Sequence, residues 1–113
     1  MKKLMIAAAF AACVSGQAFA GTMENSFGNT MIVAAPDGAT QRYFFNADNT
    51  FTATTASGES MSGTWRANGA QICLARPSGE TCYDMPADKN VGDSWTLTTP
   101  SGETRTLSLA AGR

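Results

Sequence analysis

The sequence predicts an all-β fold, a small antiparallel barrel of eight strands, and three observations support this prediction. Turn sequences centred on Gly38, Gly58, Gly79 and Gly102 recur every 20 to 23 residues. A second set of turn sequences falls between them, so turns recur about every 8–12 residues, which is typical of β-sandwiches and β-barrels. The intervals are rich in Thr, Val, Ile and aromatic residues, which favour strands. No long segment repeats apolar residues with the 3.6-residue period of a helix.

Short connections join each expected strand to the next, so every strand should pair with its neighbours in sequence as an antiparallel meander. Such a sheet can curl into a barrel or fold into a two-sheet β-sandwich, and the sequence leaves both open. The eight strands are expected at residues 29–35, 39–46, 50–55, 60–67, 70–76, 80–85, 94–99 and 103–110.

The hairpin at Asn68-Gly69 predicts which side chains of two strands point inward. Asn-Gly is typical of a two-residue turn, which would place Trp65 opposite Ile72. Opposite residues share a face of the sheet, and the shared face is then apolar. Its members are Gly63, Trp65, Ala67, Ala70, Ile72 and Leu74.

Two further hairpins give the same alternation of inward and outward residues. A three-residue loop ending in a left-handed Asn49 would pair Phe45 with Phe51. A loop over residues 100–102 would pair Trp95 with Leu107.

The aromatic side chains on these inward faces could form a core or line a ligand pocket. An eight-stranded barrel has an interior just wide enough for side chains to fill it, which favours a filled core. The expected core aromatics are Tyr43, Phe45, Phe51, Trp65, Tyr83 and Trp95.

The cysteines predict one disulfide, Cys73–Cys82. A three-residue turn between them would put the two on opposite faces of the hairpin, where no disulfide can close. The bridge therefore requires a loop of two or four residues, which pairs Ile72 with Tyr83 and puts the disulfide on the outer face.

The first residues have the features of a secretory signal peptide. Lys2 and Lys3 precede an apolar run over residues 4–14, and Ala18-Phe19-Ala20 matches a cleavage site before Gly21. The expected organisation is a signal peptide at 1–20, an N-terminal tail at 21–28 and a single β domain at 29–113. The mature domain would be periplasmic or secreted, where a disulfide persists. An alternative is a lipid anchor on Cys13, which a loose lipobox precedes.

Charge and residue chemistry exclude several function classes. Lys2 and Lys3 leave with the signal, so six Lys and Arg remain beside nine Asp and Glu, a net charge of about −3. The cations are scattered singly, so we expect no nucleic-acid partner. No later segment is apolar enough to span a membrane.

The chain has no histidine, which removes Ser-His-Asp and Cys-His catalysis and histidine metal sites. Asp84, Asp88 and Asp93 are the candidates for an ion site, but Lys89 places a positive charge among them and the spacing does not match a calcium loop. We expect no cofactor and no enzyme activity.

One stretch, residues 45–75, resembles small lipocalin-like barrels of the bacterial envelope. The resemblance lies in Gly63-Thr64-Trp65, preceded by Thr50-Phe51-Thr52 and followed by Cys73-Leu74. The predicted strands and single disulfide are also similar to bacterial barrel-type protease inhibitors, which act through an N-terminal tail like residues 21–26. Both resemblances imply a fold, and neither assigns a functional residue here.

The function expected from the sequence is a non-enzymatic exported domain that binds another macromolecule, such as an envelope protein, or serves a structural role. The alternatives are a carrier of a small apolar ligand and an inhibitor of an envelope or secreted enzyme. A cavity of several hundred cubic ångströms would favour the carrier. A contiguous exposed apolar patch would favour a protein partner. The sequence does not define the oligomeric state.

Overall fold

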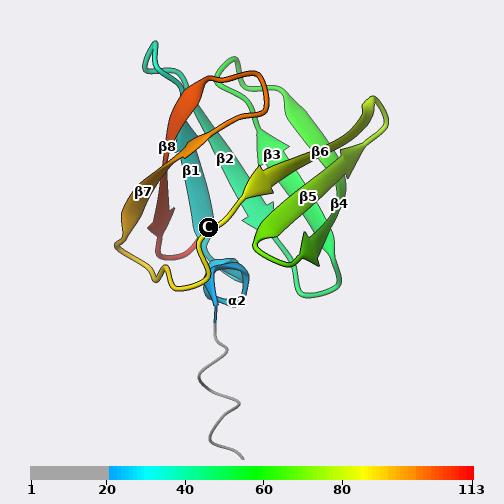
Figure 1. The fold of residues 1–113 in the computed structure, drawn as a ribbon, viewed down its shortest axis with the longest axis vertical. Helices are drawn as coiled ribbons and strands as arrows, with labels where there is room; N and C mark the ends of the chain where they lie inside the picture. Colours follow the sequence, from blue (N-terminus) through cyan, green and yellow to red (C-terminus); the bar gives the residue numbers. More distant parts are fainter. Residues whose placement is uncertain (1–20) are drawn as a thin grey trace, which may run out of the picture.

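The structure, a computed structural model, describes residues 21–113 as one antiparallel sheet of eight strands curled into a nearly closed barrel (Figure 1). The barrel prediction is therefore confirmed. One short helix, α2 (Thr22–Ser26), lies below the barrel in the view of Figure 1. The strands are β1 (Thr30–Ala34), β2 (Thr40–Phe45), β3 (Thr50–Thr54), β4 (Ser60–Asn68), β5 (Gln71–Arg76), β6 (Gly79–Asp84), β7 (Ser94–Thr98) and β8 (Thr104–Ala110).

The strand order is β6-β5-β4-β3-β2-β1-β8-β7, which departs from the expected meander at one place. β1 pairs with β8 and so curls the sheet, whereas β6 and β7, consecutive in sequence, form the two edges. The nine-residue connection over residues 85–93 explains the break, because it is too long to act as a tight hairpin turn. We call the strip between the facing edges of β6 and β7 the seam.

Two predicted hairpins are confirmed residue by residue. Phe45 pairs with Phe51, and Asn49 closes the loop with a φ of 70°. In the last hairpin Trp95 pairs with Leu107. In both cases the loop length set the register, as hairpin geometry requires.

The Asn68-Gly69 hairpin has a different register from the expected one. The loop is Gly69-Ala70, so Trp65 pairs with Leu74 instead of Ile72. Gly69 has a φ of 62°. Ala70 has no positive φ, because Asn49 is the one non-glycine residue with positive φ within 21–113. A turn with positive φ at its first central residue alone is the type II′ turn, which takes Gly at that position. The shift moves each partner by two residues, so the inward face is unchanged, although Ala67 and Ala70 are exposed near the turn.

The predicted disulfide is present. Cys73 and Cys82 are directly paired on β5 and β6 with Cα atoms 3.9 Å apart, and the two-residue loop Pro77-Ser78 gives this register. The bond lies on the outer face, yet Cys73 is fully buried. Arg66 pairs with Cys73, and its guanidinium reaches Glu80 on β6 at 3.0 Å.

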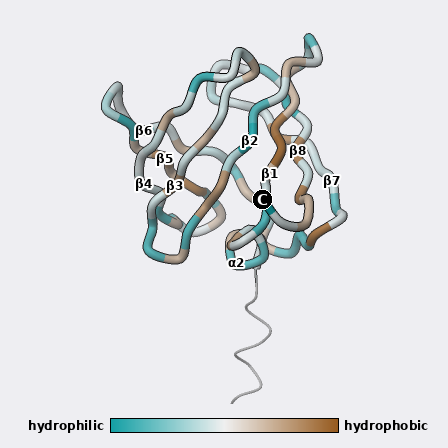
Figure 2. The backbone as a smooth tube through the Cα atoms, turned by 180° about the vertical axis from the view of Figure 1, so that it is seen from behind, coloured by the Kyte–Doolittle hydropathy of each residue, from teal (hydrophilic) through white to brown (hydrophobic). Residues whose placement is uncertain are grey.

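The core is formed by alternate residues of the strands. In Figure 2 the turns are mostly hydrophilic, and hydrophobic segments lie within strands such as β1. Within the described residues, Trp95 Nε1 is the one buried side-chain nitrogen or oxygen without a hydrogen-bond partner, whereas Trp65 Nε1 donates to the carbonyl of Asn46 at 2.9 Å. The buried apolar residues are Met23, Met31, Tyr43, Phe45, Phe51, Ala53, Trp65, Ile72, Leu74, Trp95, Leu107 and Leu109.

Residues 21–28, which the sequence suggested as an N-terminal tail, contain α2 and pack against the barrel. Glu24 accepts a hydrogen bond from the backbone N–H of Gly21 at 3.0 Å, which caps the start of α2. Thr22, Met23 and Ser26 are buried. A single helical turn is unstable by itself, so these tertiary contacts hold it.

Within residues 21–113, no helix is long and apolar enough to cross a membrane. The predicted signal peptide at 1–20 and the alternative lipid anchor at Cys13 lie outside the described residues and stay predictions.

The two tryptophans give a matched test of the core. Trp65→Ala should lower the free energy of unfolding by about 3–5 kcal/mol. Trp65→Phe should cost less, but about 0.5–1.5 kcal/mol more than Trp95→Phe, because only the first removes a hydrogen bond. Urea unfolding of the variants measures these differences. A loss under about 1 kcal/mol for Trp65→Ala would contradict its place in the core.

Gly63 gives a second test, because a side chain there has no room. A Cβ at this position would lie 2.1 Å from the carbonyl oxygen of Ala75 and 2.9 Å from the Phe51 ring. Gly63→Ala should therefore destabilise the domain by about 1–3 kcal/mol. Ser62→Ala, on the exposed face of the same strand, is the control and should cost little. Equal urea midpoints for the two variants would show that β3, β4 and β5 lie further apart at this point than in the structure.

Candidate functional site

Five of the six expected core aromatics are buried, and four of these gather on one side of the barrel. Tyr43, Phe45, Phe51 and Trp65 come from β2, β3 and β4 and contact one another, with ring centroids 5.8 to 6.3 Å apart. Trp95 is buried on β7. Tyr83, on the edge strand β6, is half-buried. The four-ring cluster thus lies on the β2–β4 side of the barrel, whereas Trp95 and Tyr83 lie on the strands that border the seam.

The seam leaves backbone hydrogen-bonding groups without a partner strand. Met85 N–H donates to the carbonyl of Ala70, in register with the β5–β6 ladder. In an antiparallel pair the residues alternate between bonding to the partner and facing away. Cys82 and Asp84 therefore direct their N–H and C=O groups toward the seam. The same alternation on β7 directs those of Thr96 and Thr98 there.

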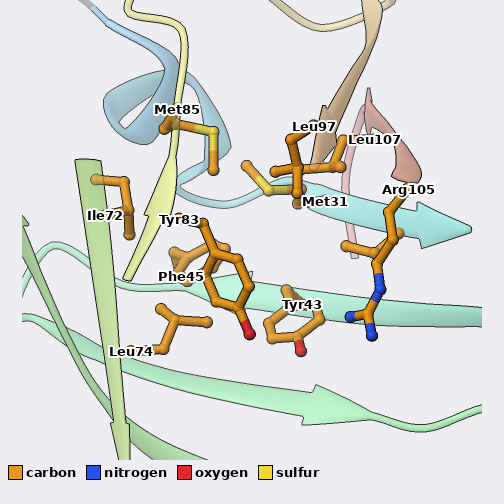
Figure 3. Close-up of a pocket in the computed structure, with 11 residues that line it drawn as sticks. Met31, Tyr43, Phe45, Ile72, Leu74, Tyr83, Met85, Leu97, Arg105 and Leu107 are labelled. Carbon is orange, nitrogen blue, oxygen red and sulfur yellow. The ribbon is translucent and has the colours of Figure 1, made fainter. Parts of the chain in front are cut away.

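An apolar cavity of about 40 Å³ opens at the seam, and we call it the seam pocket (Figure 3). It is smaller than the roughly 300–1,000 Å³ of sites that enclose a whole ligand. Its lining comes from β1, β2, β5, β6, β7, β8 and the residue after β6. The lining residues are Met31, Val33, Tyr43, Phe45, Ile72, Leu74, Tyr83, Met85, Leu97, Arg105 and Leu107.

One charged residue lines the seam pocket. Arg105 pairs with Leu97 across β7 and β8, two residues from the buried Leu107, so it occupies an inward position. Its side chain is 30% exposed, and its Nε donates to the Glu103 carboxylate at 2.8 Å. In Figure 3 the guanidinium and the hydroxyls of Tyr43 and Tyr83 lie on one side of the pocket, and Met31, Met85 and Leu97 lie on the other.

The electrostatics of Tyr43 agree with this arrangement. Burial raises its pKa above the usual value for tyrosine, as does the neighbouring Tyr83, whereas the positive charges of Arg76 and Arg105 act in the opposite direction. Tyr43 is thus a neutral phenol at neutral pH, and its hydroxyl donates to Gln41 Oε1 at 3.1 Å.

A groove of about 450 Å³ lies along the outside of the seam, lined by Asp84, Met85, Thr96 and Leu97 among others. Met85 and Leu97 also line the seam pocket, so these two side chains separate the two hollows. Methionine is flexible and adapts to irregular spaces. A second groove, about 430 Å³, lies between α2 and the β4–β5 turn, and it includes Trp65 and Met85.

α2 holds the connection that crosses the end of the seam. The Thr22 hydroxyl donates to the carbonyl of Pro86 and accepts from the N–H of Lys89 at 3.0 Å. Asn25 Nδ2 donates to the carbonyl of Lys89 at 2.8 Å and to Asn90 Oδ1 at 2.9 Å. The N-terminal segment therefore fixes residues 85–93.

The three candidate aspartates are not brought together as ion ligands. Asp84 accepts from Gln71 Nε2 at 3.2 Å, and Asp93 accepts from the N–H of Asn90 at 2.9 Å, which closes a turn. Across residues 21–113, no group of three or more Cys, Asp and Glu side chains could hold a metal ion.

Sequence reasoning placed Cys73, Cys82 and the aromatic residues but missed Arg105 as a site residue. In the charge count Arg105 was one of several scattered cations. Its position in the sequence could have identified it, because Arg105, Leu107 and Leu109 are every second residue of β8 and therefore share one face of the sheet. A charge in such a series lies on the inner face of the sheet.

No protein-family model, curated protein or solved structure matches this chain. The site therefore rests on its own geometry.

Removing the Thr22 hydroxyl tests the support of the seam. Thr22→Val leaves the Pro86 carbonyl and the Lys89 N–H without a partner, so it should cost about 1–3 kcal/mol. Hydrogen exchange of residues 85–93 should accelerate. Thr52→Val, on the exposed outer face of β3, is the control and should change neither. Unchanged exchange in Thr22→Val would show that α2 does not hold the connection.

Proposed function

We propose that this chain is a non-enzymatic, exported binding domain whose binding site is the seam. The observation that carries the proposal is that two features coincide there: unpaired strand edges and an apolar pocket with a cation at its opening. Elsewhere in the described barrel, each strand edge is paired. An exposed polar strip beside an apolar recess is typical of a surface that receives another molecule.

Export is supported by the N-terminal pattern and by the disulfide. Lys2 and Lys3, the apolar run at 4–14 and Ala18-Phe19-Ala20 favour cleavage before Gly21. A structural disulfide is typical of the periplasm or the extracellular space. Intact mass of the mature protein tests this part, because a chain that begins at a lipidated Cys13 would contradict it.

Two alternative functions are less well supported. A carrier that encloses an apolar ligand needs a larger interior than a cavity of about 40 Å³. The inhibitor hypothesis depended on a free tail at residues 21–26, but that segment contains α2 with three buried residues.

A broad apolar docking face is not supported either. In the described part of the chain, Val91, 44% exposed, is the one large exposed hydrophobic residue. We therefore favour a ligand that inserts an apolar group into the seam pocket and leaves its polar part at the opening.

Native mass spectrometry of the protein purified without denaturation from its own envelope fraction tests the proposal. Leu97→Trp should fill the seam pocket and abolish retention of the ligand, because Leu97 lines both hollows. Val91→Trp, on the exposed connection, is the matched control and should retain the ligand. The proposal would be contradicted if the wild-type protein carried no ligand. It would also be contradicted if Leu97→Trp retained the ligand as well as the wild-type protein does.

A further inference from the structure

We propose that the seam pocket binds a free short-chain carboxylate, with its apolar chain in the pocket and its carboxylate on the guanidinium of Arg105. This inference rests on the proposed function and names the ligand chemistry of the same site. It depends on the position of Arg105, the charges around it and the size of the pocket.

Arg105 occupies a position where the alternation of β8 calls for an apolar residue. It shares a face of β8 with the buried Leu107 and Leu109, and it pairs with Leu97 on the edge strand β7. Burying a charge is costly unless that charge is paired. Glu103 pairs with Nε at 2.8 Å. A guanidinium has five N–H donors in a planar fork that matches a carboxylate, so the contact with Glu103 leaves further donors for a ligand.

The groups around the opening favour an anion over a cation. None of the eleven residues that line the pocket in the described chain is acidic, and Arg105 is the charged one. Arg76 lies close enough for its charge to act on Tyr43 as well. Glu103, which pairs with Arg105, is not among the residues that line the pocket. The Tyr83 hydroxyl on the same side offers a second donor (Figure 3).

Pocket size limits the apolar part of the ligand. A cavity of about 40 Å³ holds a few carbon atoms, so a long acyl chain does not fit inside. Met85 and Leu97 separate the pocket from the outer groove, and movement of the Met85 side chain would admit a somewhat longer chain. A short aliphatic acid meets both the charge and the volume requirements.

Titration of the mature protein with hexanoate, hexanol and hexylammonium, followed by NMR, tests the inference. Hexanoate should shift the resonances of Tyr83, Met85 and Leu97 and bind more tightly than hexanol, and hexylammonium should bind least. Arg105→Gln should weaken hexanoate binding about tenfold or more, because it removes a charged hydrogen bond, and should leave hexanol binding unchanged. Arg105→Lys, which keeps the charge, should restore part of the affinity.

Arg66→Gln is the matched control, because Arg66 is an exposed cation on the outer face and pairs with Glu80. It should leave hexanoate binding unchanged. Circular dichroism establishes that each variant is folded before it is titrated.

Equal binding of hexanoate and hexanol at the seam, insensitive to Arg105→Gln, would overturn the carboxylate inference and leave the proposed binding function standing. Hexanoate binding that Arg66→Gln weakens as much as Arg105→Gln would also overturn it. Failure of the proposed function has a different signature: the seam resonances respond to none of the three probes, and Leu97→Trp retains the native ligand.

Discussion

The contact between Phe51 and the backbone of Gly63 is the packing constraint on which the barrel depends. Phe51 is fully buried and pairs with Gly63 across β3 and β4, and its ring occupies the space that a Cβ on Gly63 would need. The carbonyl oxygen of Ala75 on β5 also occupies the space that a Cβ on Gly63 would need. Three strands therefore approach closely at this point, and a glycine is the residue that permits it.

The aromatic cluster follows from this contact and fills the interior unevenly. Tyr43 and Phe45 pack on Phe51, and Trp65 packs edge-on against Phe45. Large rings thus occupy the β2–β4 side. On the other side, where β6 and β7 face each other, the edges of Tyr43, Phe45 and Tyr83 meet aliphatic and methionine side chains and one arginine around a small cavity. We infer that the seam is the part of the barrel where packing and backbone pairing leave room for another molecule.

Local rules in the sequence predicted much of this fold. Loop length and the left-handed Asn49 gave the Phe45–Phe51 pairing, and the need to close Cys73–Cys82 gave the register of β5 and β6. Both depend on interactions within one hairpin. The Gly69 turn was missed because Asn-Gly and Gly-Ala are both acceptable two-residue turns, and the choice is made by packing across the sheet.

Features that join distant parts of the chain were not predictable in the same way. The pairing of β1 with β8 and the attachment of α2 to residues 85–93 join segments more than 60 residues apart. α2 has a single turn, too short for a helical period to be visible in the sequence. The seam itself results from the length of the connection between β6 and β7. The inward position of Arg105 indicates a binding site only when β6 and β7 are known to be unpaired.

Amide hydrogen exchange along the two edge strands is the most direct test of an open seam. The N–H groups of Cys82, Thr96 and Thr98 face the seam, whereas those of Tyr83 and Leu97 bond to β5 and β8. The first set should therefore exchange at least about tenfold faster than the second. The rates are compared after correction for each residue's intrinsic exchange. Equal protection of the two sets would show that β6 and β7 pair in solution, and would contradict the open seam from which the binding site is inferred.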